Sequence, residues 1–298
     1  MPQPPSPLDR AALRRAFGRA AATVAGASFL DREVERRMAE RLGYVRLEPR
    51  RVLDAGAGTG ASLAMLRARY PRAETVAADF APALVRRARS ARPIAARLRG
   101  LVGAAPARFV CADLAALPFP AESFGLVWSN LALAFAPSVP AAIAEWRRVL
   151  ETGGLLMFST YGPDTLKELR AAFAAADAAP HVHDFVDMHD LGDMLIAAGF
   201  ADPVMDMEMV TLTYADVGAL ARDLRDSGQA SALAARRRGL TTPRAWTRMV
   251  KAYERARRDG RLPATVEVVY GHAWKAVPKA SADGRAIIRF DRAINTRR

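Results

Sequence analysis

The chain has 298 residues, of which 51% are hydrophobic and 25% are charged, a balance typical of a soluble globular protein. Its net charge of +13 comes from 44 basic and 31 acidic residues, so acidic partners should be attracted to it. No apolar run approaches the roughly 20 residues that span a bilayer. The single cysteine, Cys111, excludes an internal disulfide, which favours a reducing cytoplasm.

The chain begins with a Pro-rich segment, residues 1–9, which we expect to be disordered. This segment lacks the apolar core of a signal peptide, so secretion is not indicated. Residues 9–43 are predicted to be helical. Their Arg- and Ala-rich start also resembles an organelle presequence, but Asp9 and the spacing of the apolar residues favour an ordinary helix of the domain.

From Arg51 onward, short apolar runs alternate with helical patterns. This alternation predicts right-handed crossovers and a parallel, doubly wound α/β sheet. The predicted strands are 51–55, 74–79, 107–113, 124–130 and 154–161, and the predicted helices are 61–69, 81–91, 139–150, 164–176 and 189–198.

The last third of the chain follows a different pattern. Residues 205–214 and 265–275 are predicted strands without a crossover helix of normal size between them, so we expect an antiparallel end to the sheet. A basic helical insertion, 216–264, separates them, and the tail 279–298 is expected to be loose. The sequence thus predicts a mostly parallel seven-stranded sheet with an insertion before the last strand.

A glycine-rich loop follows the first strand, with Gly56, Gly58 and Gly60 directly after Asp54. Such a loop lets the backbone approach a ligand closely, because glycine lacks Cβ and tolerates positive φ. A G-x-G-x-x-A match taken alone is weak evidence for a dinucleotide site. The carboxylate of Asp54 disfavours a pyrophosphate at this loop and favours a ligand that carries an ammonium group.

Further polar side chains end the next three strands. Asp79 is placed to bind both ribose hydroxyls, and Asp113 to accept from the amine of adenine, although either could instead cap a helix. Adenine, ribose and a cationic tail together describe S-adenosylmethionine better than NAD. The other residues that we assign to this cofactor site are Phe80, Leu114, Ser129 and Asn130.

Four stretches are similar to the successive motifs of class I S-adenosylmethionine-dependent methyltransferases: "VLDAGAGTG", "AADFAPALVRRAR", "CADLAALPFPAESFGLVWSNLAL" and "RVLETGGLLMFST". The resemblance covers about residues 10–278 and implies a Rossmann-like methyltransferase domain over this range. Within the class, "GPDTLKELR" and "FVDMHDLGDMLIAAGFADPVMDMEMVTLTY" resemble the malonyl-acyl-carrier-protein O-methyltransferases of biotin synthesis. They also resemble a related mitochondrial assembly factor of respiratory complex I, a protein-arginine hydroxylase.

This resemblance implies methylation of the free carboxyl of a malonyl group on an acidic acyl carrier protein in the cytoplasm. An arginine hydroxylase, an assembly factor and a non-catalytic assembly protein of the same fold are the alternatives. Two positions depart from the family pattern, because Ala57 stands where Cys is common and Val24 stands where Tyr is usual. The second departure bears on the acceptor and not on the cofactor.

A malonyl carboxylate is ionised at neutral pH, so the reaction needs no general base and its catalysis would consist mainly of alignment. One cation is expected to orient the acceptor. Arg170 is a candidate, and so is Arg19, which we also place beside the cofactor; either could instead be a solvated helix-face arginine. Tyr161, at the end of the fifth strand, is expected to line the acceptor pocket or to pack in the core.

The segment "HVHDFVDMHD" contains three histidines, His181, His183 and His189, but no second cluster of ligands with the spacing of a metal site. We therefore predict no metal and place His183 near the acceptor.

The insertion is rich in arginine and could dock an acidic carrier or simply be a solvated cationic face. Nucleic acid is disfavoured, because only Trp246 and Tyr253 could stack on bases there. The sequence does not indicate an oligomeric state. The arginines concerned are Arg236, Arg237, Arg238, Arg244 and Arg248.

Overall fold

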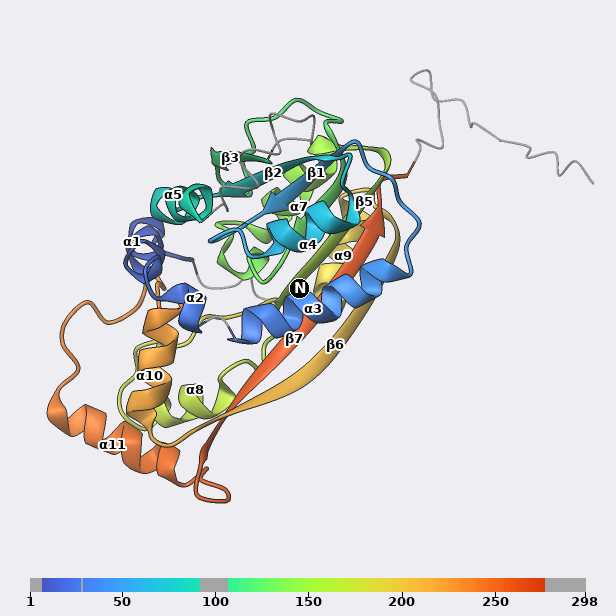
Figure 1. The fold of residues 1–298 in the computed structure, drawn as a ribbon. Helices are drawn as coiled ribbons and strands as arrows, with labels where there is room; N and C mark the ends of the chain where they lie inside the picture. Colours follow the sequence, from blue (N-terminus) through green and yellow to red (C-terminus); the bar gives the residue numbers. More distant parts are fainter. Residues whose placement is uncertain (1–6, 28, 92–106, 277–298) are drawn as a thin grey trace, which may run out of the picture.

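A computed structural model describes residues 7–27, 29–91 and 107–276, whose strands form one seven-stranded sheet (Figure 1). The strand order is β3-β2-β1-β4-β5-β7-β6, and within these residues β7 is the strand that runs opposite to all the others. The strands are β1 (Arg51–Ala55), β2 (Glu74–Asp79), β3 (Ala107–Cys111), β4 (Phe124–Ser129), β5 (Leu150–Tyr161), β6 (Ala201–Tyr214) and β7 (Leu262–Trp274).

Helices cover both faces of the sheet. On one face, α7 (Val139–Val149) and α9 (Met188–Ala197) bury Trp146 and Leu195 against the strands. On the other face, α3 (Phe29–Gly43) and α4 (Ser62–Arg69) bury Met38 and Leu66. Strands buried on both faces read as continuous apolar runs, which explains why β1, β2 and β4 were predictable from the sequence.

A third apolar cluster lies where the end of β6 pairs with the start of β7 (Figure 1). It joins α8 (Lys167–Ala174), α10 (Val217–Asp226) and α11 (Pro243–Glu254), and it includes the fully buried Met249 and Tyr253. The last two helices belong to the insertion, which therefore packs on the sheet and not apart from it. The remaining elements are α1 (Arg10–Ala20), α2 (Val24–Ala27), α5 (Pro82–Ser90) and the 3-10 turn η2 (Leu133–Phe135).

The predicted order and type of the strands are confirmed, and so is the antiparallel end of the sheet. The single helix expected over residues 9–43 is wrong, because the described residues of this range form α1, which ends at Ala20, the short α2, and α3, which begins at Phe29. The turn after Ala20 is tied to the insertion, because the Thr23 hydroxyl donates to the Asp226 carbonyl at 2.9 Å. This distant contact explains the break that the local pattern did not predict.

The ends of the chain lie partly outside the described residues. Residues 1–6 of the segment expected to be disordered, and the tail 279–298, belong to this part. Within the described part, Leu8 bridges to Leu233, and the Asp9 carboxylate caps α1 by accepting from the Ala12 amide at 2.9 Å. Residues 8 and 9 therefore connect the start of α1 to the insertion.

Candidate active site

A cavity of about 1070 Å³, which includes space open to solvent, lies beyond the carboxyl ends of β1, β2 and β4. We call one side the strand-end wall; it consists of Asp54, Gly56, Gly58, Asp79 and Asn130. We call the opposite side the helical wall; it consists of Phe17, Asp31, Arg32, Glu35 and Gln229. The cavity therefore lies where an open parallel sheet is expected to bind its ligand.

The three glycines of the loop have different roles. Gly56 has a φ of +83°, and a Cβ there would lie 2.1 Å from the Cβ of Ala132, so the chain needs glycine to pass. Gly60 (φ +80°) packs against Leu63 and does not line the cavity. Gly58 lines it, and a Cβ there would meet nothing within 4 Å. The surface next to Gly58 is thus open to a ligand.

Asp79 holds the glycine loop in place. Its carboxylate accepts hydrogen bonds from the Gly58 amide at 3.0 Å and from the Ala81 amide at 2.8 Å. Burial raises the pKa of Asp79 to about 6, although these two hydrogen bonds act in the opposite direction. Asp79 also lines the cavity, and its contact with the ribose stays a prediction.

Asp54 is only 1% exposed, and its Oδ2 atom has no hydrogen-bond partner among the described residues. Burial raises the pKa of Asp54 well above its usual value, and the nearby carboxylates of Glu35 and Asp79 raise it further. A buried acceptor without a partner is costly. Because this side chain lines the cavity, a cationic or hydrogen-bond-donating ligand would remove that cost.

Helix α3 adds two acids that the sequence interpretation missed, Asp31 and Glu35, one turn apart on its cavity side. Burial raises the pKa of Asp31 to about 6, and burial also raises the pKa of Glu35. The Asn130 side chain donates to the Asp31 carbonyl at 2.8 Å, so the end of β4 touches the start of α3. The spacing of four residues signalled a shared helix face, but not which surface that face covers.

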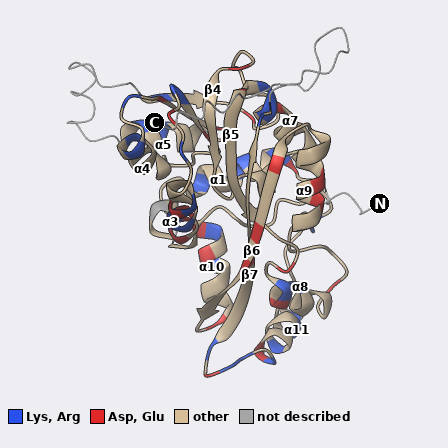
Figure 2. Ribbon diagram, turned by 90° about the vertical axis from the view of Figure 1, so that its right-hand side faces the viewer, with Lys and Arg blue, Asp and Glu red and all other residues tan. Residues whose placement is uncertain are grey.

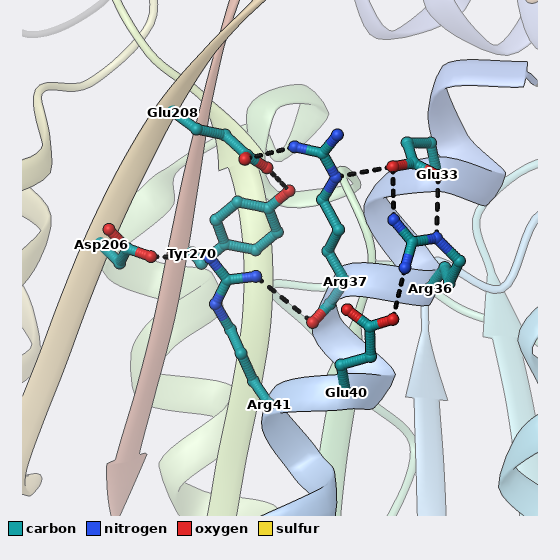
Figure 3. Close-up of polar contacts among 8 residues, drawn as sticks. All are labelled: Glu33, Arg36, Arg37, Glu40, Arg41, Asp206, Glu208 and Tyr270. Atoms are coloured by element: carbon teal, nitrogen blue, oxygen red, sulfur yellow. Dashed lines mark hydrogen bonds and ion pairs between the residues drawn. The ribbon is translucent and has the colours of Figure 1, made fainter.

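Ion pairs at the other end of α3 fix its position on the sheet (Figure 3). Arg37 pairs with Glu208 of β6, which also accepts from the Tyr270 hydroxyl, and the Arg41 guanidinium lies 4.0 Å from the centre of the Tyr270 ring. Arg41 also pairs with Asp206 at 2.7 Å. These contacts hold the helix that carries Asp31 and Glu35.

Asp113 does not point freely into the cavity. It forms an ion pair with Arg10 of α1 and accepts from the Ala115 amide at 2.9 Å. The Arg10 guanidinium also lies 6.0 Å from the centre of the Phe80 ring. Phe80 and Leu114 line the cavity, and their contact with the cofactor stays a prediction. Arg10 was missed because the sequence gave no sign that α1 reaches the end of β3.

Ser129 and Asn130 connect the ends of neighbouring strands. The Ser129 hydroxyl donates to the Ala55 carbonyl at 2.7 Å, and Ser129 does not line the cavity. Asn130 does line it, and its Oδ1 accepts from the Ser159 hydroxyl at 2.8 Å. Of this pair, Asn130 is the residue that faces the ligand region.

The residues predicted for the acceptor are used mainly in internal contacts. The Arg170 guanidinium donates to the carbonyls of Pro163 and His183, both at 3.0 Å. His183 Nε2 accepts from the Ala232 amide at 2.9 Å, and burial lowers the pKa of His183 to about 4, so its ring is neutral at pH 7. Arg19 is exposed on α1. These three side chains do not line the main cavity.

Tyr161 approaches the cavity through a second residue. It is buried, and its hydroxyl donates to Gln229 Oε1 at 3.1 Å. Gln229 belongs to the helical wall, whereas Tyr161 lines two smaller adjoining cavities. The Phe135 ring, which packs edge-on against Phe17 (5.2 Å) and Tyr161 (6.3 Å), lines both the main cavity and one of the smaller ones.

Val24, where the resembled enzymes usually carry Tyr, lines the main cavity. The departure noted in the sequence therefore falls at the site and not in a distant helix.

The side chains of the described residues determine whether a metal ion or a cofactor could bind. In residues 7–27, 29–91 and 107–276, no three His, Cys, Asp or Glu side chains gather as a metal site would require. The same residues contain no helix with the length and apolarity of a membrane span. The unpartnered Asp54 oxygen and the open surface at Gly58 fit a ligand that has an ammonium group and an adenosyl group.

Comparison with known proteins agrees with this geometry. The methyltransferase domain model matches residues 53–158. The YcgJ protein of Bacillus subtilis has a TM-score of 0.58 at 17% identity, covering 83% of this chain and all of that one, which shows the shared fold.

Two relatives cover nearly the whole chain. A malonyl-[acyl-carrier protein] O-methyltransferase of Laribacter hongkongensis is 53% identical, covering 95% of this chain and 96% of its own length. One of Gallionella capsiferriformans is 50% identical with the same coverage. Identity at this level over this length shows common family membership. The chain belongs to the S-adenosylmethionine-dependent methyltransferases, in the family of the malonyl-[acyl-carrier protein] O-methyltransferases.

Proposed function

We propose that this protein transfers a methyl group from S-adenosylmethionine to the free carboxyl of malonyl-acyl carrier protein, forming a methyl ester for biotin synthesis in the cytoplasm. The observation that best supports S-adenosylmethionine as the cofactor is the charge of the cavity lining. Among the described residues its lining contains five acids and two arginines, which suits a cation and not a dinucleotide pyrophosphate: Asp31, Glu35, Asp54, Asp79 and Asp113 against Arg10 and Arg32.

S-adenosylmethionine supplies, when bound, a methyl group activated by a positively charged sulfonium. Asp54 offers its unpartnered oxygen to the ammonium group, and Asp79 offers its remaining lone pairs to the ribose hydroxyls. Glu35 and Asp31 add negative charge to the opposite wall. This surplus of acids argues against a non-catalytic protein of the same fold, because buried carboxylates without a ligand destabilise the folded protein.

The acceptor carboxylate needs positioning but no base, because it is already ionised at pH 7. We assign the orientation of the carboxylate to the arginines that line the cavity, Arg10 and Arg32. Phe17 and Phe135 pack edge-on and keep water from this side. A dry site favours a displacement in which an anion and a cation neutralise each other, provided that binding offsets their desolvation.

The test is transfer of labelled methyl. Purified protein is incubated with methyl-labelled S-adenosylmethionine and malonyl-acyl carrier protein, and the carrier is examined for label that is released by base. Acetyl-acyl carrier protein, which lacks the free carboxyl, is the matched control and should remain unlabelled. Cofactor binding without label in the malonyl carrier would refute the proposed acceptor, and binding of NADH in place of the methyl donor would refute the cofactor.

A further inference from the structure

Two helices that border the cavity carry arginine as their only charged residue type. Helix α1, RAALRRAFGRA, contributes Arg10 and Phe17 to the cavity lining, and α5, PALVRRARS, contributes Leu84. The two helices pack against each other at one side of the sheet (Figure 1). Their buried residues face inward, so most of their arginines are left on the solvent side.

These arginines lack internal partners. Six of them are exposed. Arg15 helps to lower the pKa of the Asp9 carboxylate, and in the described part of the chain the side chains of the other five form neither an ion pair nor a hydrogen bond: Arg14, Arg19, Arg86, Arg87 and Arg89. They are among the basic residues coloured blue in Figure 2. Exposed charges of one sign without neutralising acids create a field that attracts an oppositely charged partner.

Three of the five arginines named for the insertion, by contrast, have partners within the fold. Arg236 pairs with Asp9 at 2.9 Å, Arg237 pairs with Asp177 at 3.4 Å, and Arg248 donates to the Ala176 carbonyl at 2.6 Å. The arginines of the predicted docking segment are therefore largely engaged in holding the fold. Arg238 and Arg244 are exposed and form no such contact within the described residues.

We propose that the solvent faces of α1 and α5 dock the acidic carrier domain whose thioester arm enters the adjoining cavity, an inference that rests on the proposed function. The docking face is defined by Arg14, Arg19, Arg86, Arg87 and Arg89.

The composition of this face argues against other partners. Phe17 is the only aromatic residue of the two helices, and its ring packs against Phe80 and Phe135, so none is available to stack on bases. The large hydrophobic side chains that are exposed in the described residues all lie outside α1 and α5, so the face offers no apolar anchor for a lipid surface. Charge complementarity to an acidic protein remains as its main property.

The experiment compares two double charge reversals with the same change in net charge. Arg14→Glu with Arg86→Glu alters the docking face, and Arg238→Glu with Arg244→Glu alters the insertion. Direct binding of malonyl-acyl carrier protein is measured by calorimetry, and methyl transfer is measured with this carrier and with malonyl-N-acetylcysteamine, which has no carrier domain. Melting temperatures verify that both variants fold.

We expect the first variant to weaken carrier binding about ten- to hundredfold at low salt and the second variant to change it much less. Turnover of malonyl-N-acetylcysteamine should be the same in all three proteins. Unchanged carrier binding by the first variant, or an equal loss of carrier binding in both variants, would overturn the inference. It would also be overturned if the first variant lost affinity for a 20-nucleotide RNA but bound the carrier normally. If wild-type protein binds the carrier through this face but methylates neither substrate, the docking face stands and the proposed function fails.

Discussion

The strand-end wall and the helical wall of the cavity are assembled in different ways. On the strand-end wall, Asp54 and Asp79 end neighbouring parallel strands, so the sheet itself brings them together. On the helical wall, Asp31 and Gln229 come from segments nearly 200 residues apart that meet only because α1, α3 and the insertion pack over the sheet. The first wall was predictable from the chain and the second was not, and the predictions below test this contrast.

The largest effect is expected on the strand-end wall. Asp79→Ala removes the acceptor for the Gly58 and Ala81 amides as well as the proposed ribose contact, so affinity for S-adenosylmethionine should fall at least about 100-fold, or ~2.7 kcal/mol. Calorimetry measures the affinity, and circular dichroism checks the fold. Asp193→Ala, an equal charge change at an exposed position of α9, should bind normally. Unchanged affinity of Asp79→Ala would contradict the ribose role.

A second effect concerns pH and both walls together. Asp79 and Asp31 each have a pKa raised to about 6, mainly by burial, so both are largely protonated at pH 5 and ionised at pH 7. A cationic ligand prefers the ionised forms, so its affinity should be about tenfold weaker at pH 5 than at pH 7.

The sign follows from linkage. The pKa values of Asp79 and Asp31 are higher in the folded protein than in the unfolded chain. Their protonation therefore stabilises the ligand-free folded protein at low pH, and this stabilisation is lost as the pH rises through about 6. Ligand binding should therefore release protons near pH 6, which appears in calorimetry as a binding enthalpy that depends on the buffer. An affinity that stays constant from pH 5 to pH 7 would show that these carboxylates do not face the ligand.

The fold was predicted well because its signals are local. Apolar strands with crossover helices fix a parallel sheet, and the glycines mark the turn at Gly56, where the neighbouring Ala132 leaves no room for a Cβ. The positions of the helices over the sheet have no such signal. Helix α3 is held by Arg37, whose partner Glu208 lies 171 residues away along the chain. The local sequence pattern therefore could not predict that Asp31 and Glu35 of this helix line the cavity.

The acceptor residues proposed from the sequence illustrate the same limit. Arg170 and His183 stand in suitable motifs, but their polar atoms are used on backbone groups of neighbouring segments. A pattern of residue types indicates which chemistry is available, whereas it does not indicate which partner each side chain finds. For parallel strands the topology answers that question, and for the helices only the folded structure does.

A third prediction concerns Arg170. Arg170→Met leaves the carbonyls of Pro163 and His183 without their donor, so the protein should lose about 1–3 kcal/mol of stability. Its KM for malonyl-acyl carrier protein should change less than about threefold, because the side chain does not line the cavity. Denaturant unfolding and steady-state kinetics measure the two quantities. The opposite result, a large rise in KM with normal stability, would restore Arg170 as the substrate cation.

The smallest effect is expected from Tyr161→Phe. Its hydroxyl donates to Gln229, and burial raises the pKa of Tyr161 well above its usual value, so the phenol stays neutral and cannot act as a base at pH 7. Loss of this hydrogen bond should cost about 0.5–1.5 kcal/mol and lower kcat/KM by a few-fold, without changing the pH profile.

A double-mutant cycle separates positioning from direct contact. If Tyr161 acts only through Gln229, Tyr161→Phe should have no further effect on kcat/KM in a Gln229→Ala background, because the two residues belong to one hydrogen bond. Additive losses would mean that the Tyr161 hydroxyl reaches the acceptor itself, in agreement with the role predicted from its place at the end of β5. In that case the end of β5 would contact the acceptor. The contrast between a predictable strand-end wall and an unpredictable helical wall would then apply only to the residues that bind the cofactor.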